Sequence, residues 1–592
     1  MPLDDPRVTH LSSALKAGPL LSGLLLARGF DTPASAAAFL APSGDHLHDP
    51  MLLPDMALAV ETIAGALDRG ERILVHGDYD VDGIAACALL QRALIALGGE
   101  VQTHLPHRLL EGYGLSRAAI EKAAAEGLSL LLTADCGSGA AAEVAHAHSL
   151  GMRVVITDHH HPESRVQSRR SRVEGLEPGI TPGPSTLDSR LSTSVAEVNP
   201  HRPDSLYPFL GLSGVGVAFK LVEALAARKR LPERAHWRFL DLVALGTVAD
   251  VSPLVGENRF LVKEGLDLLS NSRKTGICAL MKAAGLTAPV SSRQVAFVLA
   301  PRLNAAGRLA HPKEALHLLV TQDESEAQRL AENLCRHNRL RQEEESRTLK
   351  EALEMIDAGN FQEDKALVLD REGWHPGVIG IVASRLVEAF HRPVFMVALP
   401  DPESQRKFGV GSARAIPGFP LWEALHHCHH LLVRYGGHDQ AAGFSVLPEK
   451  LPLLRERLCE LAEQRLTGED LRPRLQVEVL AKAAHLALPA VEELDRLEPF
   501  GAGNPSPTVA IQGLRVTEIS RVGENGSHLR LRLHEPGGPV LRAIWFDRGA
   551  MAERLRIDQD VDLCLTPRVA TWNGTKSVEL RIQDAAISED EG

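Results

Sequence analysis

Aromatic residues are scarce in this chain, at 4% of its 592 residues. A surface that binds nucleic acid mainly by stacking on bases needs many rings, so such a surface is not expected. A basic excess is also missing, because 64 Lys and Arg stand against 76 Asp and Glu, giving a formal net charge of −12. This balance argues against a protein that coats nucleic acid, while a local basic groove remains compatible with it.

Cysteines are few and scattered. The chain has seven, and none forms a Cys-x-x-Cys pair. This spacing predicts reduced thiols rather than a disulfide framework or a zinc knuckle. No apolar run is long enough to span a membrane, and the N-terminus does not resemble a signal peptide. We therefore expect a cytoplasmic globular protein of about three or four domains, without a membrane partner.

The run VHGDYDVDG is the most informative segment. Polar residues occupy every second position in it, and an extended chain places such positions on one side. They are His76, Asp78, Asp80 and Asp82. Carboxylates this close repel one another, so a bound cation is indicated. The spacing also opens an EF-hand loop, but Leu89 stands where that loop needs its bidentate Glu, which excludes the EF-hand.

Two more apolar segments, 128–133 and 153–157, are typical of buried strands that end in polar residues. The polar residues are Asp135 after the first segment, and Asp158, His159 and His160 after the second. Repeated strand–acid–helix units predict a parallel α/β sheet. A single Asp there is commonly a helix cap, but several clusters at the carboxyl ends of the strands favour a shared site.

Two later segments add candidate residues. Residues 241–250 are typical of an apolar helix that carries Asp250 at its end, a fourth carboxylate for the cluster. The run PRLNAAGR supplies Arg302, Asn304 and Arg308 in what we expect to be a loop. His and Asp ligands suit manganese or magnesium, and shared carboxylates hold two cations about 3.5–4 Å apart. The residues therefore predict metal-dependent hydrolysis of a phosphoester or phosphoanhydride.

Further along the chain the pattern changes several times. Residues 164–194, rich in Ser, Arg, Pro and Gly, are expected to be a flexible surface insertion. Residues 321–358 lack Pro and Gly and are polar nearly all round, which favours an interdomain strut over a DNA-binding helix. The runs GVGSAR and GGHDQAAGFS read as small-residue turns that approach phosphate, with Arg414 and His438 beside them. The run 426–430, HHCHH, favours a partly exposed helix over a metal site.

From about residue 467 the chain consists of short alternating strands separated by turns. This pattern predicts a small β-barrel of the OB type. OB-folds commonly bind single-stranded nucleic acid, with a purely structural barrel as the alternative. The candidate contacts are Arg530, Arg532, Arg542 and Trp545.

These motifs resemble a known family. The DHH triplet at 158–160, with the acids before it, resembles the DHH phosphoesterase superfamily. The resemblance extends over about residues 50–590 through HGDYDVDG, TADCGSG, TDHH, GLSGVGVAFK, ALGTVADV, PRLNAAGR, GWHPGVIGIVASR and GGHDQAAGF. Together they look like the bacterial RecJ family, nucleases that degrade single-stranded DNA from its 5′ end. One departure from the family pattern is the insertion at 164–194, directly after the triplet.

The resemblance implies an α/β fold: a parallel-sheet DHH core, a second α/β DHH-associated domain joined by a long helix, and a C-terminal OB-like β-barrel. It implies a 5′-to-3′ exonuclease of DNA repair and recombination that uses two Mn²⁺ or Mg²⁺ ions. Single-stranded DNA is the implied partner, with a single-stranded-DNA-binding protein and a helicase as candidate protein partners. The expected parts are a helical lead-in (1–48), a DHH catalytic domain (49–320), a connecting helix (321–360), a DHH-associated substrate-binding domain (361–466) and the OB-like domain (467–592).

The resemblance also implies roles for individual residues. The implied metal ligands are His76 with Asp80 on one ion, Asp82 with His159 on the other, Asp135 as the bridge, and Asp250. At the scissile phosphate it implies His160 and Arg308, with Asp78 in a supporting role. The implied substrate-binding residues are Arg108, Ser412 and Arg414 around a terminal 5′ phosphate, Tyr113 stacked on a base, and Arg302, Asn304 and His438.

Two alternatives use the same core. A DHH hydrolase of small substrates, such as cyclic dinucleotides or very short oligonucleotides, generally lacks the C-terminal barrel. A non-catalytic replication scaffold built on a decayed DHH core is expected to have lost metal ligands, and none of the positions above is lost.

Overall fold

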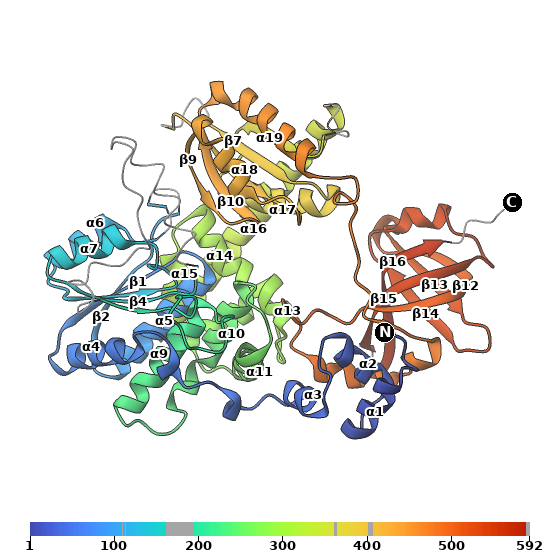
Figure 1. Cartoon of the computed structure of the whole chain (residues 1–592), viewed down its shortest axis with the longest axis horizontal. Helices are drawn as coiled ribbons and strands as arrows, with labels where there is room; N and C mark the ends of the chain where they lie inside the picture. The colour runs from blue at the N-terminus through green and yellow to red at the C-terminus, as the bar shows by residue number, and fades with distance from the viewer. Residues whose placement is uncertain are drawn as a thin grey trace. The chain divides into compact units, whose positions relative to one another are not determined.

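The computed structural model describes residues 1–108, 111–112, 114–161, 195–359, 361, 364–400, 406–572 and 574–587. The predicted insertion at 164–194 and the predicted stacking residue Tyr113 lie outside the described residues. The chain forms two compact units (Figure 1). The barrel unit comprises Met1–Leu47, Leu254–Phe260 and Arg474–Gly592, and the two-sheet unit comprises His48–Pro253 and Leu261–Pro473.

The first sheet of the two-sheet unit is parallel throughout, as predicted, with the strand order β2-β1-β3-β4-β5. Its strands are β1 (Arg72–Gly77), β2 (Glu100–His104), β3 (Leu130–Ala134), β4 (Arg153–Thr157) and β5 (Val195–Val198). Figure 1 shows helices on both faces, which is why β3 is buried along its whole length. The covering helices are α6 (Arg117–Ala125) and α7 (Ala141–Ser149) on one face, and α4 (Met56–Asp68), α5 (Val81–Ala96) and α9 (Gly214–Arg228) on the other.

A helical region follows the first sheet. Its elements are η3 (Ala235–Phe239), α10 (Leu240–Ala249), α11 (Gly256–Ser270), α12 (Thr275–Ala283), α13 (Ser292–Gln294), η4 (Val295–Leu299), α14 (Ala300–Leu309), α15 (Lys313–Val320) and α16 (Glu324–Ala358). The apolar helix that ends at Asp250 is confirmed as α10. The loop predicted for PRLNAAGR is wrong, because these residues form α14. Pro301 lies at the start of α14, directly after the helical turn η4, so its missing N–H interrupts the backbone hydrogen bonds of a continuing helix.

The long connecting helix is confirmed as α16, of 35 residues. The prediction that it is polar all round is wrong, because a stripe that includes Ala327, Leu330 and Leu334 is buried. These positions follow the three- and four-residue spacing of one helix face. Glu345 is also buried and pairs with Arg341 at 2.6 Å and with Arg385 at 2.7 Å. The helix therefore packs against its neighbours along one side rather than standing in solvent.

The second sheet of this unit has the order β6-β7-β8-β10-β9 and is mostly antiparallel. Its elements are β6 (Leu367–Glu372), α17 (Ile379–Phe390), β7 (Val394–Leu399), β8 (Gly409–Arg414), α18 (Leu421–His427), η5 (His429–Leu431), β9 (Leu432–Gly437), β10 (Ala441–Val446) and α19 (Leu451–Arg465). The turn predicted for GVGSAR is wrong, because it is the strand β8. A Cβ on Gly411 would lie 2.2 Å from the Phe444 ring, so glycine serves packing there. The run 426–430 covers the end of α18 and η5, with four exposed histidines, so the predicted helix is confirmed only in part.

The barrel unit contains a closed sheet with the order β11-β12-β13-β14-β16-β15, in which β12 also pairs with β15. Its strands are β11 (Val479–Leu480), β12 (Val509–Val522), β13 (His528–His534), β14 (Val540–Trp545), β15 (Asp560–Trp572) and β16 (Thr575–Ile587). The predicted C-terminal barrel is therefore confirmed. Trp545 is buried in its core, so this ring does not face solvent as a DNA contact would, whereas neighbouring Phe546 is 40% exposed.

The N-terminal helices complete the core of the barrel unit. They are α1 (Pro6–Leu15), α2 (Pro19–Ala27) and α3 (Pro33–Leu40). Leu20 and Leu24 lie in one hydrophobic core with Val479 and the barrel interior. Arg28 pairs with Glu478 at 2.7 Å, and the terminal ammonium of Met1 donates to the carbonyl of Glu478 at 2.8 Å. No sequence motif signalled this association of the two ends of the chain.

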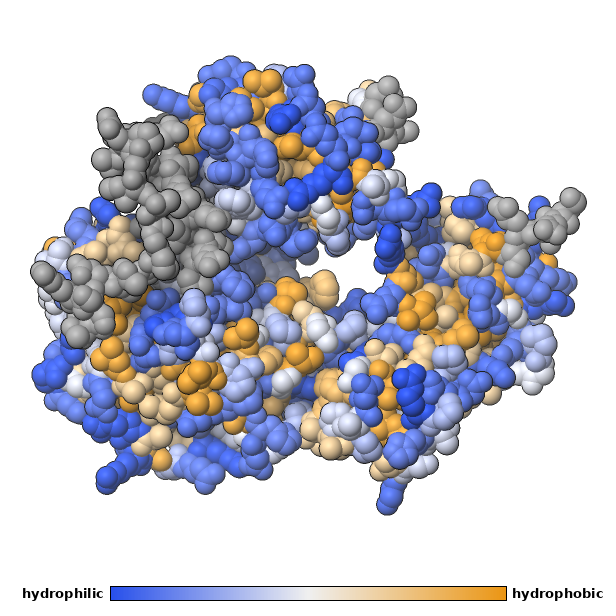
Figure 2. Space-filling view, in the orientation of Figure 1, coloured by the Kyte–Doolittle hydropathy of each residue, from blue (hydrophilic) through white to orange (hydrophobic). Residues whose placement is uncertain are grey.

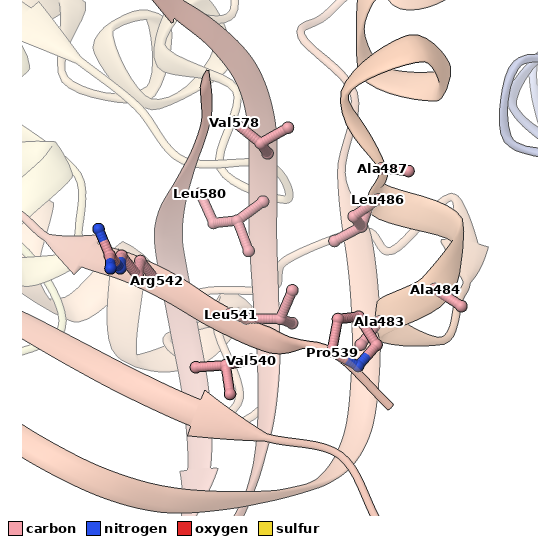
Figure 3. Close-up of a pocket in the computed structure, with 10 residues that line it drawn as sticks. All are labelled: Ala483, Ala484, Leu486, Ala487, Pro539, Val540, Leu541, Arg542, Val578 and Leu580. Carbon is pink, nitrogen blue, oxygen red and sulfur yellow. The ribbon is translucent and has the colours of Figure 1, made fainter. Parts of the chain in front are cut away.

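A surface pocket of about 420 Å³ lies on the barrel unit (Figure 3). It is bordered by the short helix η7 (Ala483–Leu486), by the segment 539–542 and by β16. Its walls are mainly aliphatic, including Leu486, Leu541 and Leu580, and Arg542 supplies the charge. Across the described residues no single helix is long and apolar enough to cross a membrane, although one bent pair, Gly44–Leu52 with Met56–Asp68 at 81°, passes by length and composition.

Candidate metal centre

The predicted acids gather where the strands of the first sheet end. Asp78 follows β1 directly, Asp135 follows β3, and Asp158 follows β4. Asp80 is the N-cap of α5, and its carboxylate accepts the backbone N–H of Gly83 at 3.1 Å. The parallel topology thus brings residues that are far apart in sequence to one edge of the sheet.

Three sets of side chains have candidate ligand atoms within 4.8 Å of one another. The sets are Asp78, Asp80 and Asp135; Asp82, His159 and Asp250; and Asp135, His159 and His160. Asp135 and His159 belong to two sets each, so the sets form one continuous cluster. His76 lies outside these sets: its Nε2 accepts the backbone N–H of Ser116 at 3.4 Å, and its ring lies 4.9 Å from that of His104.

Backbone N–H groups at the start of α9 hold Asp82 in place. Its carboxylate accepts the N–H of Gly214 at 2.6 Å and that of Val215 at 3.0 Å. A Cβ on Gly214 would lie 2.5 Å from Asp135 Oδ1, and a Cβ on Gly246 would lie 2.6 Å from Asp82 Oδ1. These two glycines let α9 and α10 approach the acids, a role that the motifs GLSGVG and ALGTVAD did not reveal on their own.

Asp158 orients the DHH triplet. Its carboxylate accepts the backbone N–H groups of Ser138 at 2.9 Å, His159 at 2.8 Å and His160 at 3.1 Å. His160 Nδ1 lies 2.7 Å from the same carboxylate, which fixes the ring and leaves its Nε2 as the atom available to a ligand. The sequence singled out Asp158 as part of the motif but did not indicate this orienting role.

Burial and like charge dominate the electrostatics of the cluster. Burial, with nearby carboxylates, raises the pKa of Asp80 and raises the pKa values of Asp82 and Asp135 well above their ordinary value. Burial lowers the pKa of His159, but the surrounding carboxylates outweigh it, so that this pKa is raised overall. Charge of one sign is therefore strongly concentrated here, and a cation relieves it.

The donor set fits divalent cations. Carboxylate oxygens, with imidazole nitrogens beside them, are ligands that Mn²⁺ and Mg²⁺ accept. Burial and the nearby His104 lower the pKa of His76 to about 3, so its imidazole is neutral near pH 7, as a metal ligand must be. The composition and charge of the cluster are thus those of a divalent metal centre.

Arginines gather near the acids, around Tyr79. The Arg108 guanidinium lies over the Tyr79 ring, 5.1 Å from its centroid. Burial first, and then Arg108, Arg341 and Arg414, lower the pKa of Arg308 to about 9. Burial and Arg108 also lower the pKa of Arg414. We call Arg108, Arg308 and Arg414 the arginine cluster, which forms a strongly positive region suited to an anion.

The arginine cluster draws its members from beside both sheets of this unit, because Arg108 follows β2 and Arg414 lies on β8. Arg308 on α14 donates to the carbonyl of Gly377 at 3.1 Å, in the loop before α17. Arg414 on β8 donates to the Ser412 hydroxyl at 3.3 Å and to the Ala413 carbonyl at 2.8 Å. A Cβ on Gly380 would lie 2.7 Å from Ser412 Oγ, so glycine keeps the start of α17 close to this group.

The other predicted substrate residues lie on α14 and in the turn between β9 and β10. Asn304 is half-buried on α14, four residues before Arg308, and Arg302 donates to the Val298 carbonyl at 2.7 Å. His438 is exposed between β9 and β10, and its backbone N–H donates to the carbonyl of Ala441, the register partner of Arg414.

A parallel sheet that ends in buried Asp and His side chains, beside a cluster of arginines, defines a metal-dependent phosphoesterase. Residues 72–247 match the DHH family, N-terminal domain, residues 363–464 match the DHHA1 domain, and residues 477–584 match the RecJ OB domain. These matches follow the order of the parts in the chain.

Relatives that match along nearly the whole of this chain narrow the class of phosphoesterase. The chain is 35% identical to the single-stranded-DNA-specific exonuclease RecJ of Bacillus subtilis, over 99% of this chain and 70% of that protein. It is 33% identical to the protein of the same name in Escherichia coli, over 96% of this chain and 95% of that protein. A crystal structure of Thermus thermophilus RecJ with Mn²⁺ matches with a TM-score of 0.80 at 34% identity, covering 98% of this chain and 78% of that one. The chain belongs to the RecJ family.

Proposed function

We propose that the chain is a metal-dependent exonuclease that hydrolyses phosphodiester bonds of single-stranded DNA from the 5′ end. The supporting relatives are named single-stranded-DNA-specific exonuclease, and the related structures were determined with Mn²⁺ and Mg²⁺. The observation that carries the proposal is the buried Asp and His cluster next to the arginine cluster. The acid cluster needs cations and the arginine cluster needs an anion, so a phosphate bound together with divalent cations would satisfy both.

Two divalent ions, Mn²⁺ or Mg²⁺, are the proposed cofactors. When bound, they supply a hydroxide from water near neutral pH and stabilise the oxygens of an in-line displacement. The proposed ligands are Asp80, Asp82, Asp135, His159, Asp250 and His76. Asp135 would serve both ions. Asp78 joins this set, because one of its oxygens lies within 4.8 Å of ligand atoms of Asp80 and Asp135.

His160 and Arg308 act on the phosphate in this proposal. Asp158 holds His160 through Nδ1 at 2.7 Å, so Nε2 is directed toward a phosphate oxygen. Arg308 is anchored by the Gly377 carbonyl at 3.1 Å and keeps further N–H groups for the negative charge that builds up in the reaction. These two side chains position the phosphate and stabilise it as the bond breaks.

The arginine cluster would determine the proposed 5′-to-3′ direction of digestion. Arg108 and Arg414, with the Ser412 hydroxyl, would bind a terminal 5′ phosphate, because guanidinium groups match phosphate oxygens in a bidentate manner. A strand held by its 5′ end places its first internal phosphodiester at the acids. Arg302, Asn304 and His438 would then contact the strand further on, and the exposed face of the barrel with Arg530, Arg532 and Arg542 would bind longer strands.

The test uses single-stranded DNA labelled at either end. With Mn²⁺, a 5′ label is expected to appear at once in mononucleotides, while a 3′ label stays in a progressively shorter strand. Without a divalent cation neither strand is expected to change. Early release of the 3′ label would reverse the polarity, and digestion in excess chelator would remove the metal from the proposal.

A small-substrate DHH hydrolase is not favoured, because residues 477–584 match the RecJ OB domain and the whole-length relatives share it. We further propose a cytoplasmic location, consistent with a DNA substrate and with cysteines that form no disulfide bond in the described part of the chain. A single-stranded-DNA-binding protein and a helicase are the proposed protein partners, since both work on the same strand.

A further inference from the structure

An exposed aromatic residue lies on the helical segment that carries the proposed substrate residues. Phe297 is 73% exposed, whereas Phe546, in the barrel unit, is 40% exposed. The Arg293 guanidinium lies 5.6 Å from the centroid of the Phe297 ring. A single exposed apolar side chain is common on protein surfaces, so it is the position of Phe297, and not its exposure alone, that bears on a binding role.

The segment 292–309 runs through α13, η4 and α14 as one helical stretch (Figure 1). Phe297 lies in η4, a single π-helical turn, and such turns are frequent at functional sites. Val295 and Leu299 on either side are buried, so the inner face of this turn is fixed while Phe297 points outward.

Helical spacing aligns Phe297 with the proposed phosphate contacts. Residues 297, 301, 304 and 308 follow one another at intervals of four, three and four, which places them on one face of a helix. Each of them is exposed or half-buried, whereas Leu299, Leu303 and Ala306 on the opposite face are buried. Phe297, Asn304 and Arg308 therefore share a face, and about 16 Å of helix axis separates Phe297 from Arg308.

We propose that Phe297, backed by Arg293, is a stacking platform for one nucleobase of the single strand, a few nucleotides beyond the bond being cut. The proposal rests on the proposed function and adds a contact to it. Aromatic stacking tolerates every base, so this platform holds the strand without reading its sequence. The Arg293 guanidinium adds a cation for the neighbouring phosphate and lies within reach of the ring.

The test is an abasic scan of a 5′-phosphorylated oligothymidylate, with affinity measured in chelator so that the strand stays intact. In the parent protein, one internal abasic position is expected to weaken binding by roughly five-fold or more. In Phe297→Ala, the intact strand is expected to bind that much more weakly, and the same abasic position is expected to cause no further loss.

Three variants make the result specific. Phe297→Trp is expected to restore binding and Phe297→Leu is not, because only a ring stacks. Leu150→Ala removes another exposed apolar side chain, which is 42% exposed. Leu150 precedes the start of β4, at the end of the strand away from the acids, so this variant is expected to bind DNA as the parent does. Cleavage of a dinucleotide, too short to reach Phe297, is expected to be unchanged in Phe297→Ala.

The outcomes separate this proposal from the function on which it rests. A parent that fails to bind or digest single strands overturns both. If the parent digests single strands but Phe297→Ala or Phe297→Leu binds them as tightly as the parent does, only the stacking platform is overturned. Binding that is restored by Leu would assign Phe297 to an apolar protein contact instead.

Discussion

Two clusters of like charge in the two-sheet unit, one of acids and one of half-buried arginines, differ in sign and in how the protein tolerates them. At the ends of the first sheet, burial and repulsion raise the pKa values of Asp82 and Asp135. In the arginine cluster, burial and repulsion lower the pKa values of Arg308 and Arg414. Each cluster is incomplete by itself, and each is completed by a ligand of the other sign. A metal-bound phosphate supplies both complements at once.

The two clusters also differ in how the chain supports them. The acids are held by backbone N–H groups, by the N-terminus of α9 and by glycines that leave room for the carboxylates. Arg308 on α14 donates to a carbonyl in the loop before α17, while Arg414 donates within its own strand, β8. The acids therefore collect at the first sheet and its helices, whereas the arginine cluster takes Arg108 from beyond β2 and Arg414 from the second sheet.

The largest expected effect comes from the shared acid. Replacing Asp135 with Asn keeps the shape but removes the charge that, in the proposed mechanism, two cations share, so activity in saturating Mn²⁺ should fall by roughly 10³-fold or more. Initial rates on a 5′-labelled strand measure this. The far-UV circular dichroism spectrum should stay that of the parent, and activity within about tenfold of the parent would contradict a shared ligand.

Metal should stabilise the protein more as the pH rises. Because the folded-state pKa values of Asp82 and Asp135 are raised, the metal-free protein binds protons there that the unfolded chain has released. Its stability is therefore expected to fall as the pH rises from about 4 through these raised pKa values. Mn²⁺ replaces the protons, so the gain in Tm on adding Mn²⁺ should grow over the same range. A gain that does not depend on pH would contradict this reading, and Asp135→Asn should reduce the dependence.

A smaller effect is expected at the arginine cluster. Arg414→Ala should weaken binding to 5′-phosphorylated strands by about tenfold and affect 5′-hydroxyl strands much less, since a charge-assisted contact contributes roughly 1.5–3 kcal/mol. Paired titrations of both strands measure this, with Arg434→Ala on β9 as an exposed arginine control. Equal losses of affinity for both strands would mean that Arg414 contacts the DNA away from its 5′ end.

The smallest effect is expected on the barrel. Arg530, Arg532 and Arg542 are exposed on the neighbouring strands β13 and β14, where Arg532 and Arg542 are register partners. Replacing all three with Gln should weaken binding of long strands and lower the salt dependence by up to about two ions. Strands of a few nucleotides should bind as before. An unchanged salt slope on long strands would make this barrel face purely structural.

Local patterns in the sequence predicted much of the fold and the acid cluster. Strands that end in Asp, such as 128–133 before Asp135, place their acids at one edge because parallel strands share a direction. The glycine and charges of PRLNAAGR favour a loop over the helix that its Ala and Leu residues form, and the glycines of GVGSAR favour a turn over the strand β8. The strand β8 pairs with β7 and β10, and Gly411 leaves room there for the Phe444 ring, contacts that a single local segment cannot show.

Long-range packing accounts for what the sequence did not reveal. The burial of one side of α16 depends on helices that fold against it, and its sparse apolar positions gave little sign of them. The N-terminal helices join the barrel core through apolar residues such as Leu20, whose partners lie more than 450 residues away in the chain. Asp158 carries no signal that distinguishes an orienting carboxylate from a metal ligand, because only geometry shows its bond to His160.

The most direct test of the account asks whether the two clusters act separately on one strand. It compares the binding of 5′-phosphorylated and 5′-hydroxyl strands to Asp135→Asn, with Arg414 either intact or replaced by Ala. The account predicts that Asp135→Asn, although unable to cut, keeps the preference for the 5′ phosphate, and that adding Arg414→Ala removes it. A preference that is already absent in Asp135→Asn, or that persists in the double variant, would contradict the assignment of metals to the acids and of the strand end to the arginines.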